Sequence, residues 1–178
     1  GYRGNAFGTS NTANGSQYSS AFGFANSSSA LQSVAFGYSN TASANYASGF
    51  GYSNVASGAY SSSFGRSNTA SAQGSSAIGY VNTASGLNSS ALGYTNTARG
   101  TNLASAMGAL STASASSSNA FGYLNTASGT SSNAFGFGNT ASATNTSVFG
   151  NTNSATAIGS SAFGSFITNA IASSTQIG

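Results

Sequence analysis

The sequence predicts an all-β fold, a parallel β-solenoid of about thirteen coils with 14 residues each. A glycine preceded by a large apolar residue recurs every 14 residues, with two steps of 15, along nearly the whole chain. Apolar and polar residues alternate within the unit, as they do in short β-strands. The chain has no proline, so every backbone N–H can join a ladder between coils. We therefore expect residues 1–178 to form a single repeat domain, a window of a longer β-solenoid array.

The recurring glycines define the period of the repeat. We expect them to lie at turns, where glycine adopts backbone conformations that are closed to other residues. These turn glycines are Gly8, Gly23, Gly37, Gly51, Gly65, Gly79, Gly93, Gly108, Gly122, Gly136, Gly150 and Gly164.

The residue before each glycine is always large and apolar. The alternation leads us to expect that it points inward, opposite Ala84 and Gly86 or their equivalents, while Thr83 and Ser85 point outward. The interior would then hold one bulky side chain per coil. This expected core spine consists of Phe7, Phe22, Phe36, Phe50, Phe64, Ile78, Leu92, Met107, Phe121, Phe135, Phe149, Phe163 and Ile177.

Asparagine is the commonest residue three positions after the glycine, as in the segment Asn82-Thr83-Ala84-Ser85-Gly86. Stacked coils place equivalent residues above one another at a spacing of about 4.8 Å. We expect these asparagines to form a ladder of hydrogen bonds along the axis, as amide side chains do in cross-β stacks.

The composition argues against catalysis. The chain has no Asp, Glu, His, Lys or Cys, and charged residues make up 2% of it. General acid–base pairs, thiolate nucleophiles and Schiff-base lysines are therefore missing, as are the usual ligands of zinc and calcium. We expect no enzyme activity, no cofactor and no metal site.

The charge pattern also disfavours two classes of partner. Arg3, Arg66 and Arg99 are far apart in sequence, whereas nucleic-acid binding needs a clustered basic surface. We interpret Arg66 and Arg99, which interrupt their rows, as isolated surface charges. No apolar run approaches the ~20 residues of a spanning helix, so we expect no membrane insertion by this segment.

The repeat resembles a known family. The segments Gln32–Gly37, Ser75–Gly79 and Ser89–Gly93 are similar to the S-V-A-I-G element of YadA-like head repeats, also called haemagglutinin-type repeats, of trimeric autotransporter adhesins. The segments Asn82–Gly86 and Asn125–Gly129 resemble the second half of that unit. The resemblance implies a left-handed parallel β-roll and a homotrimer at the bacterial cell surface. It also implies adhesion to extracellular matrix, host cells or other surfaces. Phenylalanine commonly replaces the aliphatic residue before glycine, which is a departure from the family pattern.

Two exposed rows are candidate contact surfaces. Aromatic residues directly after the glycine could form a ladder that grips a ligand or a glycan, or they could pack between chains. This possible contact ladder comprises Tyr38, Tyr52, Tyr80, Tyr94 and Tyr123. A flat hydroxyl face could bind ordered water, or it could be a solvated β-face. This face comprises Thr41, Ser43, Thr69, Ser71, Thr83, Ser85, Thr126 and Ser128.

These features lead us to expect an extracellular adhesin head or fibre segment that binds surfaces multivalently. The alternative is a structural filament, an appendage or a phage-fibre subunit. A further alternative is ice binding through the Thr-x-Ser face. In the first two cases the chain would act as a homo-oligomer, a trimer or a filament.

Overall fold

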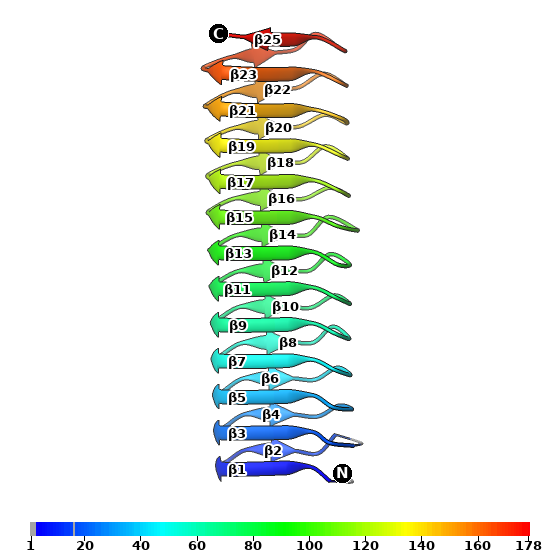
Figure 1. Cartoon of the computed structure of the whole chain (residues 1–178), viewed down its shortest axis with the longest axis vertical. Coiled ribbons are helices and arrows are strands. Elements are labelled where there is room, and N and C mark those ends of the chain that lie inside the picture. Colours follow the sequence, from blue (N-terminus) through cyan, green and yellow to red (C-terminus); the bar gives the residue numbers. More distant parts are fainter. Residues whose placement is uncertain (1–2, 16) are drawn as a thin grey trace. The chain divides into compact units, whose positions relative to one another are not determined.

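A computed structural model describes residues 3–15 and 17–178. The described residues form an all-β parallel β-solenoid of about 12 turns with a spacing near 14 residues, which confirms the predicted fold class. The chain consists of two compact units, Gly1–Asn88 and Ser89–Gly178. Each complete coil contributes one five-residue strand and one two-residue strand (Figure 1).

The first unit stacks its long and its short strands into two separate parallel sheets. Its long strands are β1 Asn5–Thr9, β3 Ser20–Phe24, β5 Val34–Tyr38, β7 Ser48–Tyr52, β9 Ser62–Arg66 and β11 Ser76–Tyr80. Its short strands are β2 Thr12–Ala13, β4 Ser27–Ser28, β6 Thr41–Ala42, β8 Val55–Ala56, β10 Thr69–Ala70 and β12 Thr83–Ala84.

The second unit has the same arrangement. Its long strands are β13 Ser90–Tyr94, β15 Ser105–Ala109, β17 Asn119–Tyr123, β19 Asn133–Phe137, β21 Ser147–Asn151 and β23 Ser161–Ser165, followed by β25 Thr175–Ile177. Its short strands are β14 Thr97–Ala98, β16 Thr112–Ala113, β18 Thr126–Ala127, β20 Thr140–Ala141, β22 Ser154–Ala155 and β24 Thr168–Asn169.

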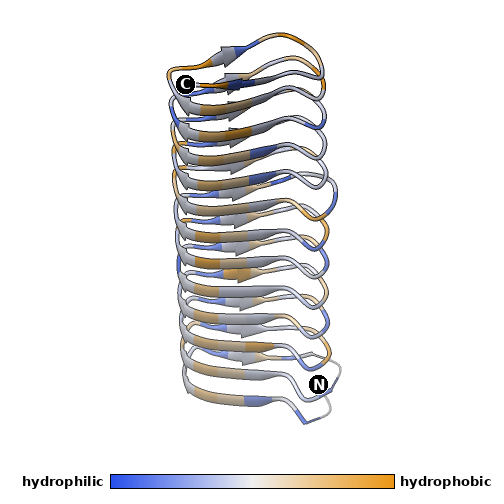
Figure 2. Ribbon diagram, turned by 45° about the horizontal axis from the view of Figure 1, so that its top comes forward, coloured by the Kyte–Doolittle hydropathy of each residue, from blue (hydrophilic) through white to orange (hydrophobic). Residues whose placement is uncertain are grey.

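Register is preserved from coil to coil, so each residue type forms a row along the axis. Phe22 pairs with Phe36, Gly23 with Gly37 and Phe24 with Tyr38. Figure 2 shows the consequence, since hydrophobic residues recur at the same place on successive long strands. The two 15-residue steps leave the strand register intact, because Thr9 still pairs with Phe24 and Tyr94 with Ala109.

The interior is filled by small side chains, mostly alanine methyl groups together with serine and asparagine. Beyond the first coil, where Ala6 is exposed and Ala13 half-buried, the alanines before the large residues and those of the short strands are completely buried, and Ala35, Ala42 and Ala56 belong to one cluster. A methyl group built on Gly49, which occupies the alanine position of β7, would already lie 3.4 Å from the Thr41 carbonyl oxygen. The space between the two sheets therefore accepts alanine and excludes phenylalanine.

The expected core spine is wrong for this reason. None of the large residues before the glycines is buried in the chain: Phe36 is 53% exposed, and the others are exposed or half-buried. On the long strand the side-chain directions are the reverse of those predicted: alanine faces inward and its large neighbour faces outward. The residues that were expected in the core and instead face outward are Phe7, Phe22, Phe36, Phe50, Phe64, Ile78, Leu92, Met107, Phe121, Phe135, Phe149, Phe163 and Ile177.

The phase assigned to the short strand was correct. Ala84 and Gly86 are buried, Thr83 is half-buried and Ser85 is exposed. The side chains that face Ala84 and its equivalents across the interior are the alanines of the long strands. Phenylalanine was predicted at that place.

The glycines of the repeat lie inside the long strands, as the fourth residue of each, so their predicted location at turns is wrong. Their φ angles are positive, from 105° to 140°, which is the region that favours glycine. A side chain on Gly37 would also collide with the carbonyl oxygen of Gly51 in the next coil. Backbone conformation and close approach both require glycine here.

Candidate functional site: two aromatic rows on the long strands

The outer side of the long strands carries a row of large apolar residues, which we call the Phe row. It comprises the large residues before the glycines, from Phe7 to Ile177, that were expected to form the core spine. In the first unit the rings of Phe7, Phe22 and Phe36 are tilted at 6.2 Å, and the stacking tightens to Phe50 and Phe64, which are 5.0 Å apart and 5° from parallel. In the second unit, Phe135 and Phe149 are 4.9 Å apart and 3° from parallel. Stacking shields the ring faces but leaves an apolar stripe in contact with solvent.

A second row, the Tyr row, occupies the last residue of each long strand. Tyr38 and Tyr52 stack at 4.9 Å and 3°, and Tyr123 and Phe137 stack at 5.3 Å and 18°. All five tyrosines of the possible contact ladder are exposed: Tyr38, Tyr52, Tyr80, Tyr94 and Tyr123. Their use in binding is not decided by this exposure and stays a prediction.

Arg66 occupies one position of the Tyr row without interrupting it. Its register partners are Tyr52 and Tyr80, and its guanidinium carbon lies 5.4 Å from the centroid of each ring. The cation thus sits between two electron-rich ring faces, which attract it. The sequence analysis interpreted Arg66 as an isolated charge, although its register with the tyrosines was visible in the 14-residue period.

A further aromatic pair lies at the other corner of the coil. Tyr46 and Tyr60 stack at 4.8 Å and 5°, and both have positive φ angles near 60°. This pair is not among the contact residues predicted from the sequence. The spacing of 14 residues between the two tyrosines was the available signal.

The predicted asparagine ladder is confirmed. It lies inside the coil, and its amides bind the backbone of the long strands that carry the Tyr row. Asn40 Nδ2 lies 3.0 Å from Asn26 Oδ1, 2.9 Å from the Phe36 carbonyl oxygen and 2.7 Å from the Gly51 carbonyl oxygen. The amide therefore ties the long strand of its own coil to the long strand of the next coil. Because the asparagine is fully buried, its hydrogen bonds are not shared with water.

The residues assigned to the hydroxyl face lie on or beside the short strands, on the outside of the coil. Thr41, Thr69, Thr83 and Thr126 are half-buried, whereas Ser43, Ser71, Ser85 and Ser128 are exposed. Each short strand is only two residues long and includes the threonine but not the serine. Ice binding by this face stays a prediction.

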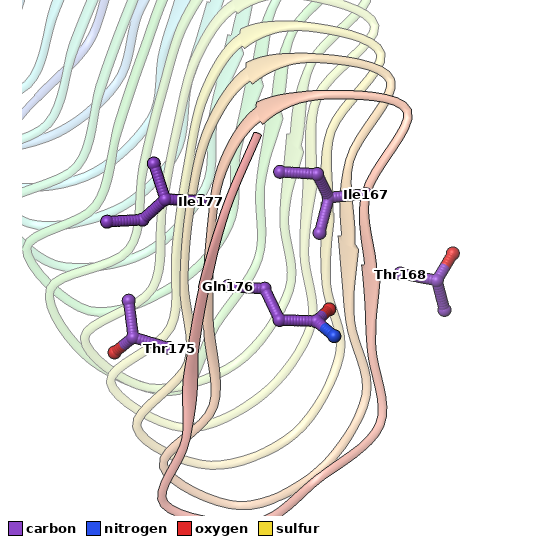
Figure 3. A pocket seen from close by; sticks show the side chains of 5 residues that line it. All are labelled: Ile167, Thr168, Thr175, Gln176 and Ile177. Carbon is purple, nitrogen blue, oxygen red and sulfur yellow. The ribbon is translucent and has the colours of Figure 1, made fainter.

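A hollow of about 550 Å³ lies at the last described rung, lined by Ile167, Thr168, Thr175, Gln176 and Ile177 (Figure 3). Gln176 occupies the alanine position and points into the opening, whereas Ile177 points away from it. The hollow is the interior of the coil seen end-on, and it carries no cluster of reactive groups.

The repeat matches a known protein family. The family model described as the YadA head domain repeat (2 copies) matches residues 16–40, 28–54, 56–82 and 84–102. These segments match YadA head repeats. The resemblance noted in the sequence is thereby confirmed for a little under half of the chain. Residues 103–178 lie outside the match and keep the 14-residue period, with strands of five and two residues as far as β24.

No curated protein matches the chain. YadA head repeats associate it with surface-exposed bacterial adhesins and with a β-solenoid that is typically not enzymatic. Among the described residues, no helix has both the length and the apolar character needed to cross a membrane.

Proposed function

We propose that this chain is part of the head of a homotrimeric adhesin that is displayed outside the bacterial cell. It binds extracellular matrix, host cells or other surfaces by many weak contacts and has no catalytic role. The match to YadA head repeats supports this proposal. The left-handed sense of winding that the family implies belongs to the same proposal.

The observation that carries the proposal is the exposed Phe row. A row of stacked phenylalanines along one side of each unit is an apolar surface that soluble monomers rarely leave open. Association of three chains through their Phe rows would remove these rings from water at about 25 cal/mol per Å² of apolar area. Trimerisation would also present three copies of every exposed row to one target surface, which raises avidity.

Sedimentation velocity and a binding assay test the proposal together. The full chain is expected to sediment as a trimer and to bind a panel of immobilised matrix proteins and cultured host cells. A variant with Phe121→Ser, Phe135→Ser and Phe149→Ser is expected to keep its β-sheet circular dichroism, to sediment as a monomer and to lose binding. Tyr46→Ser, on the opposite corner, serves as the matched control and leaves the trimer intact.

Three outcomes would overturn the proposal. A wild-type chain that stays monomeric at micromolar concentrations contradicts the assembly. End-to-end polymers without affinity for any surface indicate a structural filament. Thermal hysteresis that is lost in a Thr83→Tyr variant, with no adhesion, indicates ice binding.

A further inference from the structure

The Tyr row contains one position at which the aromatic side chain is replaced by a methyl group. Ala109 pairs with Tyr94 on one side and with Tyr123 on the other. Two strand spacings separate the tyrosines, or about 9.6 Å, because neighbouring strands lie about 4.8 Å apart. A long side chain at position 109 would lie between the two rings, whereas the alanine there contributes only a methyl group.

The first unit shows what fits such an interval. There, Tyr52 and Tyr80 are also two strands apart, and Arg66 fills the position between them with its guanidinium 5.4 Å from each ring. The two sites share strand position, register and ring type, and they differ in the central residue. Tyr94, beside Ala109, is 52% exposed, whereas Tyr80, beside Arg66, is 39% exposed.

We propose that Tyr94, Ala109 and Tyr123 form a binding slot for the guanidinium group of an arginine side chain on a partner protein. The bound arginine would occupy the place that Arg66 fills in the first unit. This inference does not rest on the proposed function, because the slot belongs to the single chain.

The chemistry of the slot favours arginine over lysine. A planar, weakly hydrated guanidinium stacks on aromatic faces, whereas an ammonium keeps a tight hydration shell. The chain offers no carboxylate, so attraction comes from the ring faces and depends little on salt. Leu110 and Leu124, which follow Ala109 and Tyr123 in sequence, are themselves exposed and offer apolar surface to the methylene stem of the arginine.

The test follows the ring signals of the tyrosines by NMR in the full chain, with Tyr→Phe variants for assignment. The probes are N-acetylarginine amide, N-acetyllysine amide and methyl β-glucoside. The arginine probe is expected to shift the Tyr94 and Tyr123 signals, with a smaller shift for the lysine probe at equal concentration. Tyr46 and Tyr60, which stack on each other at the other corner, are the internal control and should not move.

Three variants test the slot: two fill it, and the third opens the equivalent site in the first unit. Ala109→Arg fills the slot from within and should abolish the response of Tyr94 and Tyr123. Ala109→Tyr places the commonest residue of the row there, so it keeps the fold if the arginine variant does not, and it should abolish the response as well. Arg66→Ala should make Tyr52 and Tyr80 respond to the arginine probe.

The proposal is overturned if Tyr94 and Tyr123 do not respond, or if every tyrosine shifts alike. It is also overturned if Ala109→Tyr or a folded Ala109→Arg still responds, or if Arg66→Ala gains no response. A response to the glucoside in place of arginine would identify the slot as a sugar site.

Discussion

At the scale of single residues, the buried asparagine is the most constrained polar group of the coil. Asn54 Nδ2 lies within 3.0 Å of three acceptors, Asn40 Oδ1 and the carbonyl oxygens of Phe50 and Gly65. Its own Oδ1 accepts from both nitrogens of Asn68. A side chain that replaces this asparagine must both donate and accept, and it must do so without water.

Asn54→Asp is expected to destabilise the chain by about 3 kcal/mol at neutral pH, because a buried carboxylate would face three acceptors. The same contacts raise the pKa of the introduced carboxyl above its unfolded value of about 3.9. The variant should therefore be most stable below that pH and should lose stability as the pH rises. Denaturant unfolding at several pH values measures this.

The control is Asn151→Asp, at an exposed position where the side-chain oxygen accepts from the Thr152 hydroxyl. A carboxylate retains that acceptor, so its unfolding free energy should stay close to that of the wild type. Equal effects of the two substitutions would contradict the role assigned to the asparagine ladder.

Two glycines of β7 should respond in opposite ways to the same substitution. Gly51→Ala meets a positive φ of 117° and the Gly65 carbonyl oxygen, so we expect a loss of about 3 kcal/mol. Gly49→Ala restores the methyl group present at the equivalent Ala35 and should stabilise the chain by about 0.5 kcal/mol. Melting curves of the two variants check the sign of each effect, and a stabilising Gly51→Ala would refute the first.

At the scale of the strand, the phase of the alternation decides which residues build the core. Ala120 is completely buried, whereas Phe121 beside it on β17 is half-buried on the outside. Ala120→Leu should therefore destabilise the chain by about 3 kcal/mol, because the added methylene groups overpack a space sized for methyl groups. Phe121→Leu, a residue already present in the Phe row at Leu92, should cost less than about 1 kcal/mol.

Thermal unfolding of these two variants in a background with Phe135→Ser and Phe149→Ser, which weakens association and keeps Phe121, separates core packing from association. A larger loss for the change at position 121 than for Ala120→Leu would restore the inward assignment of the large residues.

The sequence predicted the strands, their register and the asparagine ladder, because all three follow from the 14-residue period. It did not predict the direction of the side chains on the long strand. Alanine and phenylalanine alternate there, and a hydrophobic ranking alone favours burial of phenylalanine. The width of the coil decides the matter, and that width is set by alanines on both strands, as at Ala35 and Ala42.

The rows could be predicted only in part for a similar reason. Tyr38, Tyr52 and Tyr80 were recognised as a ladder from their spacing. Two features of the Tyr row depend on neighbours in adjacent coils: Arg66 lies between two rings, and Ala109 places only a methyl group between two tyrosines. The charge and size of each residue taken alone do not predict them.

At the scale of the whole molecule, the repeat replaces charge with neutral hydrogen bonds. An in-register stack sets identical residues about 4.8 Å apart, and like charges at that distance repel one another. Amides, hydroxyls and aromatic rings instead gain from each added neighbour. The three arginines occupy different rows of the repeat, so no two of them are stacked in register.

This composition makes the stability of the folded chain nearly independent of pH. The sequence has no Asp, Glu, His, Lys or Cys, so no side chain ordinarily titrates between about pH 5 and pH 9. The number of bound protons then hardly differs between the folded and unfolded states, and the unfolding free energy should vary by less than about 0.5 kcal/mol across that range. Denaturant unfolding at fixed ionic strength measures it, with Asn54→Asp as the control that must show a slope. A slope in the wild type comparable to that of the control would contradict this prediction, because it would require a group whose proton affinity changes on folding within that range.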